Sequence, residues 1–316
     1  MSATPGAAPP ISIVLCTHNR VGYLRSALES IFDQGETRHA YELILIDNCS
    51  SDGTAELGKA MARVGLLRYL PEPELGLCHA RNTGWRNARG RYVAYFDDDA
   101  LAEPGWIDAI ADAFASTPTA GVVGGRVDPI WEAERPGWLS DSVALSLTIV
   151  DWSSEPKSIP DVRVEWLVGA NMAVPRQILE EIGGFDPRLD RIGTHMLSGG
   201  DVFLQKAIVE RGYGCLYYPA MAIRHLAART RLNKPWFHAR YYWQGISDAV
   251  MILITERPSP GRRFVMAAKS LGELLRHPGE LWNLLGSSND PAAFERRCFT
   301  LIHVGYIAGL LGKARA

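Results

Sequence analysis

Short apolar runs alternate with amphipathic segments over the first third of the chain. Ile11–Cys16, Leu43–Ile46 and Tyr92–Phe96 are brief runs rich in β-branched and aromatic residues, a pattern typical of buried strands. Leu66–Leu70 is a further strand candidate. Between these runs, apolar residues recur every three or four positions, as they do on one face of a helix. Repeated strand–helix units predict an α/β fold with a mostly parallel sheet and helices on both faces.

The pattern becomes less regular after Gly121. Val164–Val168 is an expected strand, and the stretch Ile130–Pro160 before it is long enough to suggest a binding loop or a lid. The further helices expected here are Arg176–Ile182 and Asp201–Arg211, and the further strands are Tyr213–Tyr218 and Ala222–His225. From Lys234 onward the chain is predicted to be helical, with helices over Pro235–Glu256, Arg262–His277 and Pro291–Gly312.

Composition places the chain among globular proteins with a sizeable core. Of its 316 residues, 47% are hydrophobic and 22% are charged, and the formal net charge of −2 gives no general attraction to nucleic acid. The five cysteines are odd in number and contain no Cys-x-x-Cys pair, which argues against a disulfide framework or a structural zinc site and fits a reducing cytoplasm. Residues 1–10 lack the features of a signal peptide and are predicted to form a disordered tail.

The C-terminal region offers two interpretations. No apolar run reaches the 18 residues of a membrane span, and the nearest candidate, Cys298–Gly312, is predicted to be a packed helix, with a helix on a membrane surface as the alternative. We therefore expect a cytoplasmic protein, with the inner face of the cytoplasmic membrane as the second location. The aromatic segment Trp236–Ile246 is predicted to pack on the catalytic domain or at a homodimer interface, with an acceptor groove for a glycan or lipid-linked glycan as the alternative.

Three polar clusters follow three of the predicted strands. They are Thr17–Arg20, Asp47–Asp52 and Asp97–Asp99. In open α/β sheets, ligands bind beyond the carboxyl ends of the strands. We therefore expect the three clusters to meet at one edge of the sheet.

The acidic triplet Asp97–Asp99 is the strongest of these features. Adjacent carboxylates repel one another, and a divalent cation such as Mg²⁺ or Mn²⁺ relieves that repulsion. A solvated acidic turn is the alternative. The position of the triplet directly after a buried strand favours the metal site.

The remaining polar candidates are ambiguous when taken singly. Asp47–Gly53 is consistent either with a turn that caps a helix or with a site for a nucleobase and ribose. Asp201 is either a helix cap or a general base that accepts a proton from a hydroxyl. A lone histidine such as His225 is more often a satisfied surface residue than a metal ligand.

Seven motifs occur in an order that decides between these alternatives. They are Ile11–Arg20, Ile46–Thr54, Ala80–Gly84, Phe96–Ala100, Gly169–Val174, Ile182–Asp186 and Gly199–Leu204. The ordered set closely resembles the family 2 glycosyltransferases, which have the GT-A fold, and the resemblance covers about Pro10 to His225. It implies a GT-A catalytic domain over residues 11–225, with a nucleotide-binding half over about 11–100 and an acceptor half over about 101–225. Residues 226–316 would then form a helical extension.

The resemblance implies a nucleotide-sugar donor bound at the strand ends. Asp47 corresponds to the carboxylate that contacts the imide of uracil or thymine, which favours a UDP- or dTDP-sugar. The other implied nucleotide-binding residues are Thr17, Asn19, Arg20, Ser50, Asp52, Arg81, Asp97 and Asp98. Asp99 and His225 are the implied metal ligands, together with Asp97, and the implied cofactor is Mn²⁺ or Mg²⁺.

The resemblance also implies an acceptor site built around a catalytic base. Asp201 corresponds to that base, whereas Gly200 stands where the family usually has Glu. We expect the acceptor to contact Gly200, Trp166 and Asn171. The implied activity is inverting transfer of a sugar to a hydroxyl of a glycan or lipid-linked glycan, as in the synthesis of bacterial cell-envelope polysaccharides. The alternatives are a nucleotidyltransferase and a non-catalytic module that binds nucleotide sugars.

Overall fold

The computed structural model describes residues 10–190, 196–276, 279 and 289–313, which form two compact units. The first, called the sheet unit, is made of Met1–Ile130, Ile149–Pro187 and Gly200–Leu226. The second, called the helical unit, is made of Trp131–Thr148, Arg188–Gly199 and Ala227–Ala316. Two segments from the middle of the chain thus group with the C-terminal helices. The division into domains at residue 225 stays a prediction, and residues 1–9 of the predicted tail and the predicted helix end at His277 lie outside the described residues.

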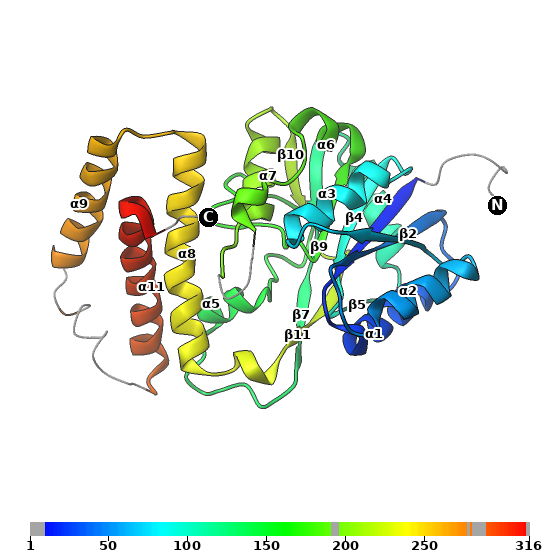
Figure 1. Cartoon of the computed structure of the whole chain (residues 1–316), viewed down its shortest axis with the longest axis horizontal. Coiled ribbons are helices and arrows are strands. Elements are labelled where there is room, and N and C mark those ends of the chain that lie inside the picture. The colour runs from blue at the N-terminus through cyan, green and yellow to red at the C-terminus, as the bar shows by residue number, and fades with distance from the viewer. Residues whose placement is uncertain (1–9, 191–195, 277–278, 280–288, 314–316) are drawn as a thin grey trace. The chain divides into compact units, whose positions relative to one another are not determined.

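The sheet unit is built on a sheet of eight strands (Figure 1). In spatial order they are β3 (Arg68–Glu72), β2 (Tyr41–Asn48), β1 (Ile11–Thr17), β4 (Tyr92–Asp97), β9 (Asn171–Pro175), β6 (Ala120–Gly124), β10 (Gly214–Tyr217) and β8 (Lys157–Ser158). β9 and β8 run antiparallel to their neighbours, and the other neighbouring pairs are parallel. The predicted mostly parallel sheet is therefore confirmed.

Helices cover both faces of this sheet. On one face, side chains of α3 (Leu77–Asn87), α6 (Arg176–Ile182) and α7 (Gly200–Val209) share a buried cluster with alternate strand residues such as Val14 and Tyr95. The next residue along β4, Phe96, points to the other face and meets Trp106 of α4 (Trp106–Ser116) edge to face, with ring centroids 5.1 Å apart. Helices α1 (Val21–Phe32) and α2 (Thr54–Arg63) complete the unit. The alternation of the strand residues therefore produces the two-sided core.

A second, smaller sheet joins distant parts of the sequence. Its strand order is β5 (Ala100–Ala102), β11 (Ile223–Ala227) and β7 (Val127–Trp131). β11 runs antiparallel to β5, and His225 is in register with Ala100. This pairing places the residues after the acidic triplet beside those around His225.

Two predictions for the middle of the chain need correction. The expected strand Val164–Val168 is wrong, because the chain turns there and Val164 is 69% exposed. The strand of this region is β9, which begins at Asn171 and inserts between β4 and β6. The stretch Ile130–Pro160 is not uniformly irregular, since it contains α5 (Asp141–Ala144), the 3₁₀ turn η1 (Leu145–Leu147) and β8.

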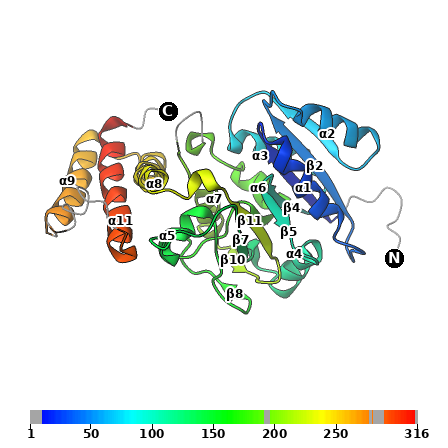
Figure 2. The same ribbon diagram turned by 90° about the horizontal axis from the view of Figure 1, so that it is seen from below.

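The helical unit is organised around α11 (Pro291–Ala308), which lies between α8 (Lys234–Thr255) and α9 (Pro260–Arg276) in both views (Figures 1 and 2). Among the described residues, the 3₁₀ turns η2 (Pro187–Leu189) and η3 (Arg229–Arg231) and the π-helical segment η4 (Gly309–Lys313) are the remaining helical elements. Within the described part of the chain, no helix combines the length and the apolar character that a membrane span requires.

Close packing holds α8 against α11. A Cβ added at Gly305 would collide with the backbone of Tyr242, so the helices approach at a position that only glycine allows. Phe237 of α8 is wholly buried and contacts Phe294 of α11 and Trp138 edge to face. The aromatic segment of α8 thus packs within its own unit.

Candidate active site

The three polar clusters meet because their strands are parallel neighbours. β1 lies between β2 and β4, with Thr17 in register with Asp47 and Cys16 in register with Asp97. The carboxyl ends of the three strands therefore lie side by side. This arrangement is the one expected from the strand-end rule.

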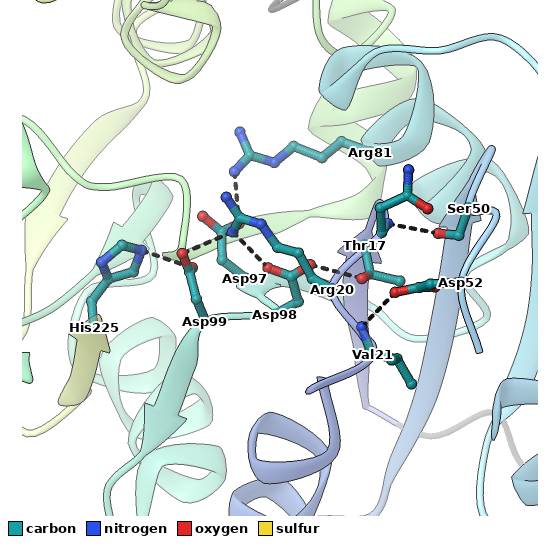
Figure 3. Close-up of polar contacts among 11 residues, drawn as sticks. Thr17, Arg20, Val21, Ser50, Asp52, Arg81, Asp97, Asp98, Asp99 and His225 are labelled. Atoms are coloured by element: carbon teal, nitrogen blue, oxygen red, sulfur yellow. Dashed lines mark hydrogen bonds and ion pairs between the residues drawn. The ribbon is translucent and has the colours of Figure 1, made fainter. Parts of the chain in front are cut away.

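Thr17 and Arg20 hold the acidic triplet (Figure 3). The Thr17 hydroxyl donates to Asp98 at 2.7 Å, and Nη1 of Arg20 donates to Asp98 at 3.0 Å and to Asp99 at 2.8 Å. Asp98 is only 4% exposed, and burial raises its pKa to about 6, a shift that Arg20 opposes and Asp99 reinforces. Burial acts to lower the pKa of Arg20, but Asp98 and Asp99 together raise it above its ordinary value. The site thus concentrates negative charge in a place that water reaches poorly.

A histidine from the smaller sheet completes a set of potential metal ligands. Nε2 of His225 lies 3.1 Å from Oδ1 of Asp99, and the backbone N–H of Leu226 donates to the Asp99 carbonyl at 3.0 Å. One ligand atom from each of Asp97, Asp99 and His225 lies within 4.8 Å of the others, so this group could hold a metal ion. Two carboxylate oxygens and one imidazole nitrogen suit Mn²⁺ and are also acceptable to Mg²⁺. The residues present therefore fit the implied cofactor.

Arg81 of α3 interacts with two carboxylates of the site. Its Nη2 donates to Asp97 at 3.2 Å, and the guanidinium stacks near Phe185. Burial acts to lower the pKa of Arg81, but the charges of Asp97 and Asp201 raise it. A Cβ added at Gly169 would lie 2.7 Å from Nη1 of Arg81, so the guanidinium occupies space that a side chain there would need.

Asp201, the predicted base, is the second residue of α7. Its carboxylate accepts from the backbone N–H groups of Gly169 at 3.1 Å and Val202 at 3.0 Å. The bond to Gly169 reaches across to the loop before β9, so Asp201 does more than cap its own helix. It lies in the same electrostatic neighbourhood as Arg81 and Asp97.

Asp47 is buried at the end of β2. Its Oδ1 accepts from the backbone N–H of Ser50 at 3.0 Å, and its Oδ2 accepts from the Tyr69 hydroxyl at 2.7 Å. Burial and the nearby Asp47 charge raise the pKa of Tyr69 above its ordinary value. Tyr69 was not predicted from the sequence, because the strand candidate Leu66–Leu70 contains it but its register opposite Leu45 depends on strand pairing.

Asn19, Ser50 and Asp52 join the first two strand-end loops. The Asn19 backbone N–H donates to the Ser50 hydroxyl at 3.0 Å. The Val21 N–H donates to Asp52 at 3.0 Å (Figure 3). The Thr54 N–H also donates to Asp52 at 3.0 Å, and the nearby Thr54 side chain and these backbone N–H groups lower the pKa of Asp52. These contacts fix the loops relative to each other.

The three residues expected at the acceptor are not gathered into one cluster by the contacts found. Gly200 begins α7 and lies near Cys78, whose Sγ would be 3.1 Å from an added Cβ. The Trp166 carbonyl accepts from Nε1 of Trp152 at 2.8 Å. Asn171 is wholly buried, and its side chain accepts from Trp106 and donates to two backbone carbonyls. These bonds favour a structural part for Asn171 over the predicted acceptor contact.

Comparison with known proteins identifies the family. The family model described as Glycosyl transferase family 2 matches residues 12–183, just over half of the chain. The chain belongs to this family. The predicted resemblance is thereby confirmed.

Several members resemble the chain over much of its length. It is 26% identical over 253 residues to a glucosyl-dolichyl phosphate glucuronosyltransferase of Haloferax volcanii, a match that covers 79% of each chain. Glycosyltransferase AglE of the same organism is 25% identical over 211 residues, covering 66% of this chain and 64% of the relative. Chondroitin synthase of Escherichia coli is 30% identical over 210 residues, covering 64% of this chain but only 29% of the synthase.

A solved structure supports the fold of this family member. The crystal structure of GalNAc-T7 with UDP, GalNAc and Mn²⁺ aligns with a TM-score of 0.55 and 17% sequence identity. The alignment covers 78% of this chain and 51% of that one. At this identity the likeness concerns the fold alone, and it confirms the expected GT-A architecture.

Proposed function

We propose that the protein is an inverting, metal-dependent glycosyltransferase that uses a UDP- or dTDP-sugar. The observation that carries the proposal is that Asp47 lies at the same sheet edge as the group Asp97, Asp99 and His225, and that Arg81 interacts with both Asp97 and Asp201. A donor bound at this edge would find a base-binding carboxylate, a metal site and a general base. Family membership favours this reaction over the nucleotidyltransferase alternative.

The donor half of the mechanism rests on Asp47 and the metal ligands. The Asp47 carboxylate would accept a hydrogen bond from the imide N–H of uracil or thymine, the bases whose ring offers that donor. Asp97, Asp99 and His225 would hold Mn²⁺ or Mg²⁺, which when bound neutralises the charge that develops on a leaving diphosphate. Arg81, which donates to Asp97, would add positive charge beside the same site.

The acceptor half rests on Asp201. Its carboxylate would take the proton from an acceptor hydroxyl while that oxygen attacks the anomeric carbon and the nucleoside diphosphate leaves from the opposite face. A single displacement of this kind inverts the anomeric configuration. The bond from the Gly169 N–H orients the carboxylate and leaves lone pairs for the hydroxyl.

We infer that the acceptor is a hydroxyl of a glycan or a lipid-linked glycan. One relative is named for glucuronosyl transfer to a glucosyl-dolichyl phosphate and another for chondroitin synthesis, which supports this class of acceptor. We also propose that the protein serves bacterial cell-envelope polysaccharide synthesis at the inner face of the cytoplasmic membrane. A lipid-linked acceptor would bring the enzyme to that surface.

Replacement of Asp201 tests the proposed base. Asp201→Asn keeps the size of the side chain but removes its ability to accept a proton, so transfer should fall by at least about 100-fold, in line with typical general-base contributions. Binding of UDP, followed by calorimetry, should stay close to wild type. Near-normal transfer by Asp201→Asn would rule out the base assignment, and full activity in EDTA would rule out the metal.

A further inference from the structure

Helix α9 of the helical unit is apolar on two sides. One side faces inward: Ala267 and Leu274 are buried, and Ala267 packs in a cluster with Ala249 of α8 and Leu310 of η4. A helix at the border of a core normally needs only this one apolar stripe. α9 carries a second one.

The second apolar stripe is exposed. Phe264 is 66% exposed, Val265 52%, Leu271 47% and Leu275 59%. Phe264, Ala268, Leu271 and Leu275 succeed one another at intervals of three or four residues, so they fall on one side of the helix. Single exposed apolar residues are normal on a protein surface, but a continuous stripe along one helix marks an interaction surface. We call Phe264, Val265, Ala268, Leu271 and Leu275 the outer face of α9.

A line of basic residues borders the outer face. Arg262, Lys269 and Arg276 follow one another at intervals of seven residues and therefore lie along one side of the helix. A shallow hollow on this surface is lined by apolar residues of the outer face and by basic residues of the border: Phe264, Val265, Ala268, Lys269, Gly272, Glu273 and Arg276. The basic line is therefore next to the apolar stripe. Arg276 pairs with Glu273 at 2.5 Å and Arg262 with Glu256 at 2.6 Å. In all, α9 contains four basic residues, Arg263 among them, and one acidic residue.

The terminal helix does not offer a comparable surface. Cys298 is wholly buried, Gly305 packs against α8, and Leu310 is 3% exposed. Phe299 and Leu311 are 44% and 60% exposed, but their spacing in the sequence does not place them on one continuous stripe. The apolar character that made Cys298–Gly312 a candidate for a membrane surface is therefore largely used inside the helical unit. In the structure, α9 is therefore the better candidate for a helix on a membrane surface.

We propose that the outer face of α9 binds the surface of a lipid bilayer that contains anionic phospholipids. Phe264, Leu271 and Leu275 would enter the boundary between headgroups and acyl chains, as the apolar side of an interfacial helix does. The long side chains of the basic border can reach outward from the same level to anionic headgroups. The positive charge of the border thus favours an anionic bilayer surface over an uncharged apolar surface.

Vesicle sedimentation of the full chain tests this inference. Vesicles of phosphatidylcholine alone are compared with vesicles of phosphatidylcholine and phosphatidylglycerol in equal parts, at low and high salt. We expect binding to the anionic vesicles, a loss of at least about tenfold on neutral vesicles, and weaker binding at high salt because the headgroup attraction is screened. Failure of the wild-type chain to bind either vesicle would overturn the inference.

Two double variants assign the binding to the outer face. Phe264→Ser with Leu271→Ser removes exposed apolar side chains and should weaken binding at least about tenfold, since membrane affinity scales with the apolar area inserted. Val64→Ser with Leu66→Ser is the matched control, because these side chains are 72% and 51% exposed in the sheet unit. The control should bind as wild type, and all the variants should unfold at nearly the wild-type temperature.

Other outcomes assign the face differently. If the Phe264/Leu271 variant still binds anionic vesicles as wild type does, the inference is wrong. If that variant instead converts a dimer to a monomer in size-exclusion chromatography and the wild type ignores vesicles, the face binds a second copy of the chain. Vesicle binding needs neither donor nor metal, so these results are independent of the proposed reaction.

Discussion

At the scale of single residues, the site is governed by how negative charge is compensated. Three adjacent aspartates stand at the end of β4, and Arg20, Arg81 and His225 approach them from three different elements. The two guanidinium groups neutralise part of the charge, yet burial still raises the pKa of Asp98 to about 6. Binding of a cation would therefore reduce the electrostatic repulsion within the site.

The raised pKa of Asp98 predicts a pH dependence of stability. A carboxyl that binds its proton more tightly in the folded state contributes stability at low pH and loses it as the pH rises from about 4 to about 6. Asp98→Asn should remove this contribution. In EDTA, the melting temperature of the wild type should therefore fall relative to that of Asp98→Asn as the pH rises through that interval. A constant difference would show that Asp98 titrates normally.

Asp47 carries the prediction on the nucleobase. Asp47→Asn replaces a charged acceptor by an amide, and a hydrogen bond to a charged group is worth ~1.5–3 kcal/mol, so UDP affinity should fall about 10- to 100-fold. Tyr69→Phe removes only one partner of the carboxylate and should weaken UDP by less. Both constants can be measured by calorimetry, and an unchanged affinity of Asp47→Asn would exclude the contact.

At the scale of helices and strands, glycine decides how closely α8 and α11 approach. An added Cβ at Gly305 would meet the Tyr242 backbone, which cannot move aside as a side chain can. Gly305→Ala should therefore destabilise the protein by about 1–3 kcal/mol, the usual effect of overpacking. Urea unfolding of the whole chain provides the measurement.

Gly272 of α9 is the matched control for this prediction. It is also a helical glycine, but an added Cβ would meet nothing within 4 Å. Gly272→Ala should leave stability unchanged or raise it by up to about 1 kcal/mol through helix propensity. Equal effects of the two substitutions would show that the contact with α8 is not the determinant.

Elements were predictable where local pattern sufficed. The strands that end at Thr17, Asn48 and Asp97 are recognisable as apolar runs followed by polar residues. The strand-end rule then places Asp47 and Asp97 at the same edge of the sheet. The place of β9 between β4 and β6 depends on pairing between distant segments, which no local pattern encodes. The same holds for His225, which reaches Asp99 through the pairing of β11 with β5 and was expected there only by resemblance to the family.

At the scale of the whole molecule, the sequence order and the spatial grouping differ. Segments 131–148 and 188–199 belong with the C-terminal helices, although they lie within the stretch that the family motifs span. Tertiary contacts alone reveal this grouping. The residues proposed to bind the donor, by contrast, all fall within the sheet unit, so donor and metal binding can be tested without knowledge of the acceptor.

Thermal unfolding with nucleotide sugars tests the central claim most directly. A ligand that binds only the folded protein raises its melting temperature according to its concentration and affinity. UDP- or dTDP-sugars with Mn²⁺ should raise the melting temperature clearly more than GDP-sugars do, and EDTA or Asp99→Ala with His225→Ala should remove most of the effect. Equal shifts for all three nucleotides, or shifts that EDTA leaves intact, would contradict the account.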